Sequence, residues 1–560
     1  MRILRVSRLV AGLAAGTIAV GVFAFGPEPV RAQTAVGQAP APAQGPTRRL
    51  SIDEAVALAL EQNLDLQVER INPQVQDFAI AVARSGWVPT VQTSLNNRTT
   101  DSPPDSFLSG ATGVLTDKRF ASSVGVQQLL PWGGSYTASW DSGRFETNNN
   151  FSSFNPRLSS NVSLNYTQPL LRNFKIDGTR QQLLVSQKNR EISDVQLQQT
   201  IATTMRAVKN AYWDLVGAND NLSVQRQSLQ LAQQSLRDNR ARVEIGTMAP
   251  IDIVQAEAEV AQREEAVIVA EAAIARAEDR LRALISNPGE PDFWSMRIEP
   301  SDVATFTPVL VDPDAAVRTA LDKRTDLTVT RKQIESNDVS IRFFRNQTLP
   351  DVNAQVNYSA VGLGGTQLVF GQGFPPPVIG SNKRSFASTL ADALGGDFPT
   401  WSVGVQVSYP IGGSNAEANL ARARLQNQQA QRQLQSQELQ IATQVRDLAR
   451  TVQTNAKRVE ATRASRALAE KRLEAEEKKF QAGMTTSFFV VQAQRDLNQA
   501  RNNELQALID YQKSIVDYET AQIAPVAGGG GGVTGVSTAG FTGGTAAVGA
   551  TGATGGGRQP

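Results

Sequence analysis

A long-range internal duplication constrains the fold of this chain more than any other feature of its 560 residues. The stretch DEAVALALEQNLDL, which starts at Asp53, resembles DAAVRTALDKRTDL, which starts at Asp314, and the register holds at an offset of 261 residues as far as Pro89 and Pro350. Similarity at so long a period indicates two copies of one structural unit. Each copy is expected to run from a short helix and a second helix, through strands, to two long helices.

The strands are predicted within residues 87–172 of the first copy and 350–410 of the second. Apolar and polar residues alternate there; Val162, Leu164 and Tyr166, for example, are interleaved with Ser163 and Asn165. Alternation with a period of two gives a strand one apolar and one polar face. Such faces fit either a half-buried soluble sheet or transmembrane strands with a polar lumen.

Two parts of these strand regions depart from the simple pattern. Residues 119–144 alternate around Pro131-Trp132-Gly133-Gly134 like an additional hairpin, so the pattern leaves the number of strands open. Residues 99–118 and 359–400 are long and contain Gly, Ser and Pro, so we expect them to form surface loops.

Four long helices are predicted, at residues 177–245, 250–286, 415–481 and 486–522. In the first, apolar residues recur every seven positions, at Val208, Leu215 and Leu222 and onward, which predicts supercoiled helix pairs. A second position of each heptad would also face the partner helix. It is occupied by polar residues at Asn219, Arg226, Gln233 and Arg240. Such a row fits an ordinary coiled coil or a row of side chains that faces a water-filled interior.

Each pair of long helices is joined by a similar turn. Gly246 in VEIGTMAPIDIVQAE and Gly483 in FQAGMTTSFFVVQAQ both stand eight residues before a Val-Gln-Ala triplet. Glycine at this place suits a helix C-terminus that needs a positive φ. We therefore expect both glycines to cap the helices that precede them.

Composition argues against an enzyme and against a nucleic-acid-binding protein. The chain has no histidine and no cysteine, which removes the usual nucleophilic triads and most zinc sites. No paired acidic motif stands out, and we expect no cofactor and no metal. The formal net charge falls from +2 to −1 once the four arginines and one glutamate of residues 1–32 are removed, so charge does not indicate nucleic acid as a partner.

The two ends of the chain differ in composition from the repeats. Residues 1–32 have a basic start and an uncharged, glycine-rich stretch, which favours a cleaved signal peptide over a membrane anchor. Residues 33–49 are predicted to be a flexible linker. Residues 524–560 are too rich in glycine to form a core, so this tail is predicted to be disordered.

The ordered set of motifs resembles the TolC-type outer-membrane efflux family. The resemblance runs from about residue 50 to residue 522 and rests on LSIDEAVALALEQN, TQPLLRN, GTMAPIDIVQAE and GMTTSFFVVQAQRDL. It implies a first repeat at 50–310 and a second at 311–523, each with a helix–strand–strand–helix plan. It also implies a homotrimer in which four strands per chain close a transmembrane β-barrel of about 12 strands. A long α-helical, coiled-coil tunnel would extend from this barrel into the periplasm.

The function implied by the resemblance is passive conduction across the outer membrane. The channel would be the exit duct of a tripartite efflux or type I secretion system. Its implied partners are a periplasmic adaptor, an inner-membrane pump of the RND or ABC type, and the lipid of the outer membrane. The alternative is a periplasmic coiled-coil adaptor or scaffold, although an adaptor usually carries one helical hairpin rather than two.

The same resemblance implies roles for residues at the two turns. Residues expected to contact the adaptor are Gly246, Thr247, Met248, Gly483, Met484 and Thr485. Residues expected to form the pore constriction are Asp252, Phe488 and Phe489. Other roles stay open: Asp252 would also favour a helix N-terminus, and the two phenylalanines would also suit a coiled-coil core.

Overall fold

The computed structural model describes residues 47–104, 113–286, 289, 293–294, 296–374 and 376–526. The predicted signal peptide at 1–32 lies outside these residues, as do most of the linker at 33–49 and nearly all of the tail at 524–560. The chain divides into the units Met1–Gly45 and Pro46–Pro560, and every described residue belongs to the second.

The described residues form two repeats whose elements follow a similar order, except that the second has helix α7 among its strands. The first repeat contains β1 (Thr47–Leu50), α1 (Ile52–Gln62), α2 (Leu64–Ser85), β2 (Thr90–Ser102), β3 (Leu115–Leu129), β4 (Ser135–Thr147), β5 (Phe154–Pro169), α3 (Gly178–Glu244) and α4 (Ile251–Ile285). The second contains β6 (Arg297–Pro300), α5 (Pro313–Lys323), α6 (Thr325–Gln347), β7 (Asp351–Phe370), β8 (Val378–Arg384), α7 (Phe386–Gly395), β9 (Pro399–Ser408), α8 (Asn415–Gln481) and α9 (Ser487–Ala521).

Equivalent contacts occur at equivalent places in the two repeats. The Arg70 guanidinium donates to the Leu60 carbonyl at 2.6 Å, where it joins α2 to the end of α1. The Arg331 guanidinium donates to the Leu321 carbonyl at 3.1 Å and joins α6 to α5 in the same way. Since both residues of each pair differ by the offset of the duplication, the two copies share a side-chain contact as well as a sequence pattern.

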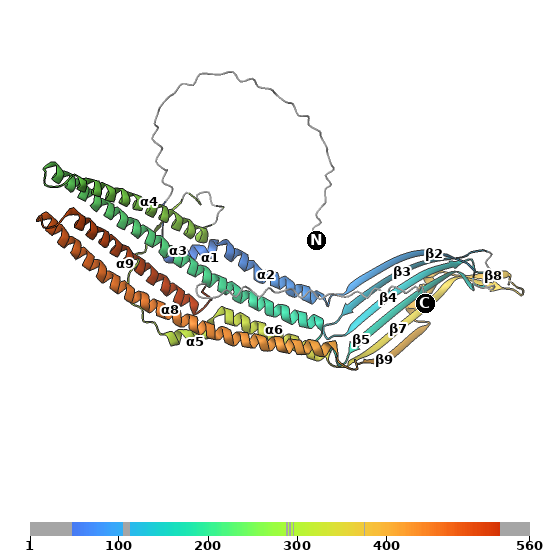
Figure 1. The fold of residues 1–560 in the computed structure, drawn as a ribbon. Helices are drawn as coiled ribbons and strands as arrows, with labels where there is room; N and C mark the ends of the chain where they lie inside the picture. The colour runs from blue at the N-terminus through green and yellow to red at the C-terminus, as the bar shows by residue number, and fades with distance from the viewer. Residues whose placement is uncertain are drawn as a thin grey trace, which may run out of the picture. The chain divides into compact units, whose positions relative to one another are not determined.

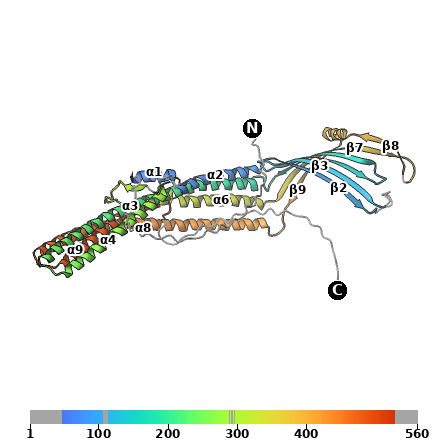
Figure 2. The ribbon, with the colours of Figure 1, turned by 90° about the horizontal axis from the view of Figure 1, so that it is seen from above.

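The four long helices form two hairpins, α3 with α4 and α8 with α9 (Figure 1). Helices α3 and α8 each have 67 residues, and at 1.5 Å per residue each is about 100 Å long. Strands β2 to β5 and β7 to β9 lie at the end of the helices opposite the hairpin turns (Figures 1 and 2). No helix in the described residues is both long enough and apolar enough to span a membrane.

The buried core lies where the short helices pack on the long ones. Val208 and Leu215 of α3 lie there together with Ala55 and Ala59 of α1. The hydroxyl of the fully buried Tyr212 donates to Asp302 at 2.8 Å, and the main-chain amide of Ile52 donates to the same carboxylate. This core fixes the first helix of the repeat to the middle of α3.

One antiparallel sheet contains seven of the described strands, in the order β2-β3-β4-β5-β7-β8, with β9 also paired to β7. This sheet therefore has more strands than the four per chain that the family resemblance implies. The two further positions come from β3 and β4, the hairpin that residues 119–144 suggested. Its turn lies at the helical end of the sheet, where Gln128 donates to the Trp87 carbonyl at 2.8 Å.

The segment 359–400, expected to be a loop, is largely ordered. It continues β7 to Phe370 and then forms β8 and α7. Ser385 caps the first turn of α7 through the Ser388 amide, and Gly396 ends the helix with a φ of 74°. The Gly and Ser residues that suggested a loop instead terminate a short helix and a short strand.

The sheet has two faces of opposite character. One row across it consists of Val124, Trp140, Val162 and Ala360, which are direct partners in successive strands. The next row consists of Ser123, Asp141, Asn161 and Val361. Since partner residues in adjacent strands project to the same side, one face is apolar and the other mainly polar.

Candidate functional site at the helical tips

The first helical tip is closed by a left-handed glycine. Helix α3 ends at Glu244, and Gly246 follows with a φ of 76°. The Gly246 and Thr247 amides donate to the carbonyls of Val243 and Arg242, each at 2.9 Å. This pair of bonds satisfies the last carbonyls of the helix, as expected for a glycine cap.

The second tip repeats this geometry. Gly483 has a φ of 72°, and its amide donates to the Phe480 carbonyl at 3.1 Å. The next amide, that of Met484, donates to Lys479 at 2.9 Å. The prediction that both glycines cap their helices is confirmed.

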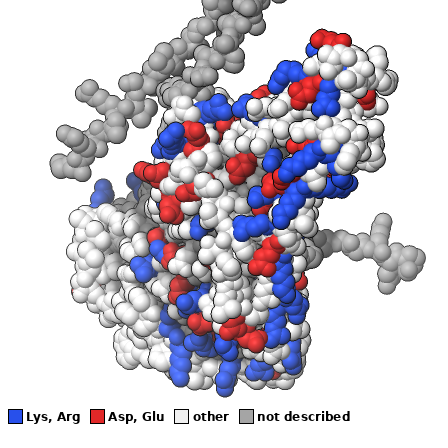
Figure 3. Space-filling view, turned by 90° about the vertical axis from the view of Figure 1, so that its left-hand side faces the viewer, with Lys and Arg blue, Asp and Glu red and all other residues white. Residues whose placement is uncertain are grey.

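The other predicted tip residues differ in exposure. Thr247 and Met484 are exposed, whereas Met248 and Thr485 are half-buried. On the face that carries the tips, basic and acidic side chains are intermingled (Figure 3). Near the second tip, for example, Lys478 pairs with Glu474 at 2.6 Å and Lys479 with Glu476 at 2.7 Å.

Asp252 connects the two hairpins. It lies in the first turn of α4, where a carboxylate also interacts favourably with the helix dipole. The hydroxyl of Ser487, the first residue of α9, donates to Asp252 Oδ1 at 3.0 Å. Ser487 is only 6% exposed, so this bond is shielded from water on the serine side. The carboxylate predicted for a pore constriction therefore joins the starts of both return helices.

Phe488 and Phe489 lie outside the core of their own hairpin. They are 55% and 52% exposed, and their rings meet edge to face with centroids 5.6 Å apart. The core there is formed instead by Leu473, Val490, Ala493 and Leu497. Of the two roles considered for these phenylalanines, the coiled-coil core within one chain is wrong.

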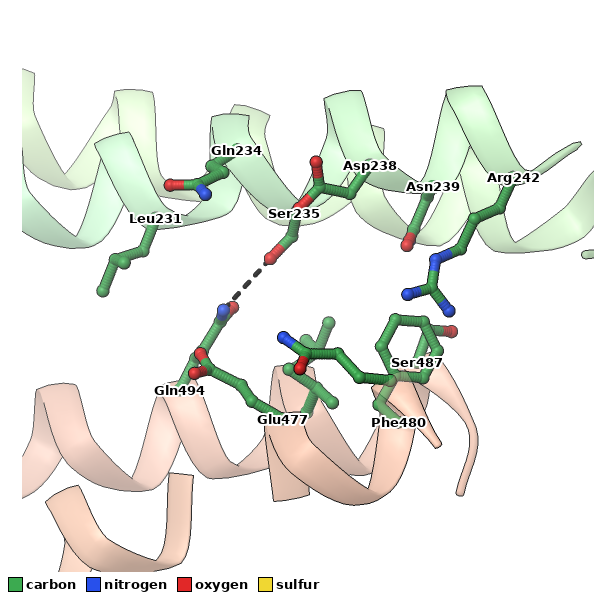
Figure 4. A pocket seen from close by; sticks show the side chains of 13 residues that line it. Leu231, Gln234, Ser235, Asp238, Asn239, Arg242, Glu477, Phe480, Ser487 and Gln494 are labelled. Carbon is green, nitrogen blue, oxygen red and sulfur yellow. Dashed lines mark hydrogen bonds between the residues drawn. The ribbon is translucent and has the colours of Figure 1, made fainter. Parts of the chain in front are cut away.

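A small cavity of about 300 Å³ lies between α3 and the second hairpin, close to the tips (Figure 4). On one side Gln494 donates to Ser235 at 3.0 Å. On another, the Arg242 guanidinium lies over the Phe480 ring, 4.3 Å from its centroid. Burial, reinforced by the nearby Glu474, raises the pKa of Glu477 in the cavity wall. The hairpins are thus held together by polar contacts around a polar space.

A buried ionic group lies one heptad further along α4. The Glu259 side chain is 4% exposed and binds Arg263 at 2.6 Å and Arg495 of α9 at 2.6 Å. Two arginines satisfy the two oxygens of one buried carboxylate, as such a charge requires. This group is the second connection between α4 and α9.

The polar seam row contacts the partner helix. Arg226 binds Glu271 at 2.8 Å and Arg240 binds Glu257 at 2.6 Å, and each pair joins α3 to α4 at an exposed position. Asn219 donates to the carbonyl of Leu215 in its own helix. These contacts are typical of charged positions that flank a coiled-coil seam.

Sequence reasoning did not find Ser487, Glu259 or Arg495. The available signal was the spacing of seven residues between Asp252 and Glu259, which places both carboxylates on one side of α4. Their partners in α9 lie more than 230 residues away in the chain, at separations of 235 for Asp252–Ser487 and 236 for Glu259–Arg495. No group of three or more acidic side chains in the described part of the chain is arranged to hold a metal ion.

Comparison with known proteins identifies the family. The model of the outer membrane efflux protein family matches residues 55–287 and 316–521, which is one match to each repeat. The chain belongs to this family, and its function is that of an outer-membrane efflux channel rather than of an enzyme or an adaptor. No curated protein sequence matches the chain.

Solved channels show the same fold. The chain is similar to CusC, with 14% identity and a TM-score of 0.60 over 85% of this chain and 92% of that one. It is similar to CmeC of Campylobacter jejuni, with 14% identity and a TM-score of 0.59 over 84% and 85%. For VceC of Vibrio cholerae the identity is 16% and the TM-score 0.58, over 84% of this chain and 96% of that one. The family implies a trimeric channel of a tripartite efflux system.

Proposed function

We infer that the protein is a homotrimeric exit duct whose resting constriction lies at the helical tips. The observation that carries this proposal is the Asp252–Ser487 bond, which joins the two return helices at the end remote from the sheet. A contact that holds the tips together narrows any passage between them. Loss of this contact would widen the passage.

The free edges of the sheet support assembly with further copies. Among the described strands, β2 pairs only with β3, and β9 pairs only with β7. Unpaired strand edges cannot face lipid, so a transmembrane sheet must close into a ring. Three chains joined edge to edge would place the apolar face toward lipid and the polar face toward a water-filled lumen.

Within this trimer, three copies of Asp252 and of the Phe488–Phe489 pair would surround the axis. Apolar rings can obstruct a pore by excluding water, and carboxylates attract cations. The half-exposed phenylalanines would supply the apolar ring, and the second oxygen of Asp252 would supply the charge. The constriction would be less acidic than one formed from two carboxylate rings, because the second tip has Phe489 where the first has Asp252.

The turns at the two tips are the proposed contact with a periplasmic adaptor. Gly246, Thr247, Met248, Gly483, Met484 and Thr485 form two turns that share one backbone geometry, so one kind of adaptor surface can bind both. The intermingled charges around the tips favour a partner with mixed rather than single-sign charge. An inner-membrane pump of the RND or ABC type would supply the energy.

Single-channel conductance of the purified protein in planar bilayers tests the constriction. Asp252→Ala and Phe489→Ala should each raise the open conductance or the open probability, and Asp252→Ala should also weaken block by divalent cations. Glu265→Ala, at an exposed glutamate further along α4, is the matched control and should behave as wild type. Unchanged conductance and unchanged cation block in both variants would place the constriction elsewhere.

A further inference from the structure

Helix α7 lies on the apolar face of the sheet and not at its edge. It packs on β5 and β7, next to β8 at the end of the sheet remote from the long helices (Figure 2). Its seat is formed by small residues: a Cβ atom added to Gly362 would overlap the Thr389 carbonyl, and one added to Gly364 would overlap the Thr389 hydroxyl. Thr389 is fully buried as a result.

The row of strand residues on which α7 packs belongs to the apolar face of the sheet. Gly362 is the direct partner of Ser160 in β5, and Ser160 is two residues from Val162 on the same side of the strand. Ser160 is fully buried and accepts a hydrogen bond from the Trp140 indole at 2.9 Å. Helix α7 therefore occupies the surface that faces lipid in the proposed barrel.

A groove of about 580 Å³ runs beside this helix. Its floor includes Val124, Trp140, Val162 and Leu164, and its wall is formed by Leu390 and Leu394 of α7. The indole nitrogen of Trp140 is already bonded to Ser160, so the side chains of this set offer only apolar surface. Leu394 is 69% exposed, which leaves the groove open along one side.

The position of the groove excludes a neighbouring copy of the sheet as its occupant. Copies would join at the edges β2 and β9, whereas the floor of the groove is formed by β3, β4 and β5. An outer-membrane strand surface at this place is in contact with lipid. An apolar groove that opens onto the bilayer fits a flexible hydrocarbon chain.

We propose that the groove between α7 and strands β3–β5 binds an acyl chain of an outer-leaflet lipid, with α7 lying along the membrane interface. The inference rests on the lipid-facing assignment of the apolar face in the proposed function. The outer leaflet follows because α7 lies at the end of the sheet opposite the periplasmic helices. The polar side chains of α7 are shielded: Ser388 and Asp392 are both half-buried, and Asp392 also pairs with Arg384 at 2.9 Å.

Photolabelling of the full chain in liposomes tests the proposal. The probe is a phospholipid with a diazirine on one acyl chain, and adducts are mapped by mass spectrometry. We expect adducts on the peptides that contain Trp140 and Leu394. Leu390→Trp, which fills the groove without adding charge, should abolish them, whereas Ala391→Trp on the exposed side of α7 should not.

Three results would overturn the inference. One is equal labelling of Trp140 in wild type and Leu390→Trp. The second is labelling confined to Val403 and Val405 of the exposed edge strand β9, which would show ordinary lipid contact without a groove. The third is a cross-link from α7 to a second copy of the chain. Conductance recorded on the same samples separates a failed groove from a failed channel, because Leu390→Trp should conduct as wild type.

Discussion

The Ser487 hydroxyl donates to Asp252 Oδ1 at 3.0 Å and so joins two helices that begin 236 residues apart, α4 at Ile251 and α9 at Ser487. The bond lies beyond the last apolar layer of the second hairpin, which ends at Val490. The first turns of α4 and α9 are therefore joined at the tips by a polar contact.

Ser487→Ala should increase channel opening. The substitution removes the donor while it preserves a small buried side chain, and a hydrogen bond to a charged group contributes about 1.5–3 kcal/mol. We expect a higher open probability in single-channel recordings, with the unitary conductance of the open state unchanged. Thr486→Ala is the control, since the side chain of this N-cap residue makes no capping bond. Equal open probabilities in wild type and Ser487→Ala would contradict the proposed role of the bond.

Removing both arginines that bind Glu259 should destabilise the helical part strongly. Arg263→Met together with Arg495→Met leaves a buried carboxylate without a partner, which typically costs about 3–5 kcal/mol. Arg495→Met alone should cost less, because Arg263 still binds the same carboxylate. Denaturant unfolding followed by circular dichroism measures the difference.

The matched control for this pair of variants is Arg472→Met. Arg472 binds Asp496 at 2.8 Å between α8 and α9, and its side chain is 59% exposed. Exposed ion pairs contribute about 0–1 kcal/mol, so this variant should unfold almost as wild type does. If all three variants lost the same stability, burial of Glu259 would not be the cause.

Acid should weaken the contact between α3 and α6. There Lys188, Glu191, Lys332 and Glu335 form alternating ion pairs between the two helices. The Lys332 ammonium is the main cause of a lowered Glu191 pKa, and Lys188 lowers that of Glu335. A carboxylate with a depressed folded-state pKa contributes stability above its unfolded value, here 4.5, and loses it as the pH falls through the folded value.

The measurement is the difference in unfolding temperature between wild type and Glu191→Gln. It should favour wild type at pH 7 and shrink as the pH falls below about 4.5. High salt should reduce the difference at pH 7, because the four side chains are partly exposed. A difference independent of pH would mean that the carboxylate charge does not stabilise this contact.

The closed barrel should contain more strands than the family plan implies. Six strands, β2 to β5 with β7 and β9, follow one another from edge to edge across the sheet of each chain, so a trimer joined at its edges would have about 18. Since barrel diameter grows roughly linearly with strand number, the ring would be about 1.5 times as wide as one of 12 strands. Electron cryo-microscopy of the purified trimer counts the strands directly. A ring of 12, with β3 and β4 outside the wall, would refute this prediction.

Much of the fold was predictable because its signals are local. The heptads around Val208 and Leu215 and the offset between Pro89 and Pro350 depend only on nearby residues and on comparison of the two copies. The number of strands was not predictable, because apolar and polar residues alternate in the same way in a strand of the barrel wall and in an inserted hairpin. In addition, residues 119–144 have no counterpart in the second copy. Helix α7 was missed since its Gly and Ser flanks are also typical of loops.

Some features of the candidate site were likewise predictable from the sequence and others were not. Positive φ at Gly246 and Gly483 follows from the steric freedom of glycine, so the caps were predictable. The partner of Asp252 depends on how two hairpins pack, and no pattern within either hairpin specifies Ser487. The exposure of Phe488 and Phe489 likewise depends on which of several nearby apolar residues fills the hairpin core.

The contacts from Arg70 to Leu60 and from Arg331 to Leu321 have a consequence for engineering. Both repeats have the same contact between their two short helices. A segment of one repeat can therefore replace the equivalent segment of the other while the surrounding fold is kept. A chimera with residues 480–494 transplanted over residues 243–257 would have six identical tips in the trimer. Such a chimera would turn a threefold symmetric entrance into one with pseudo-sixfold symmetry, a form in which the contribution of each tip to the proposed adaptor contact becomes measurable.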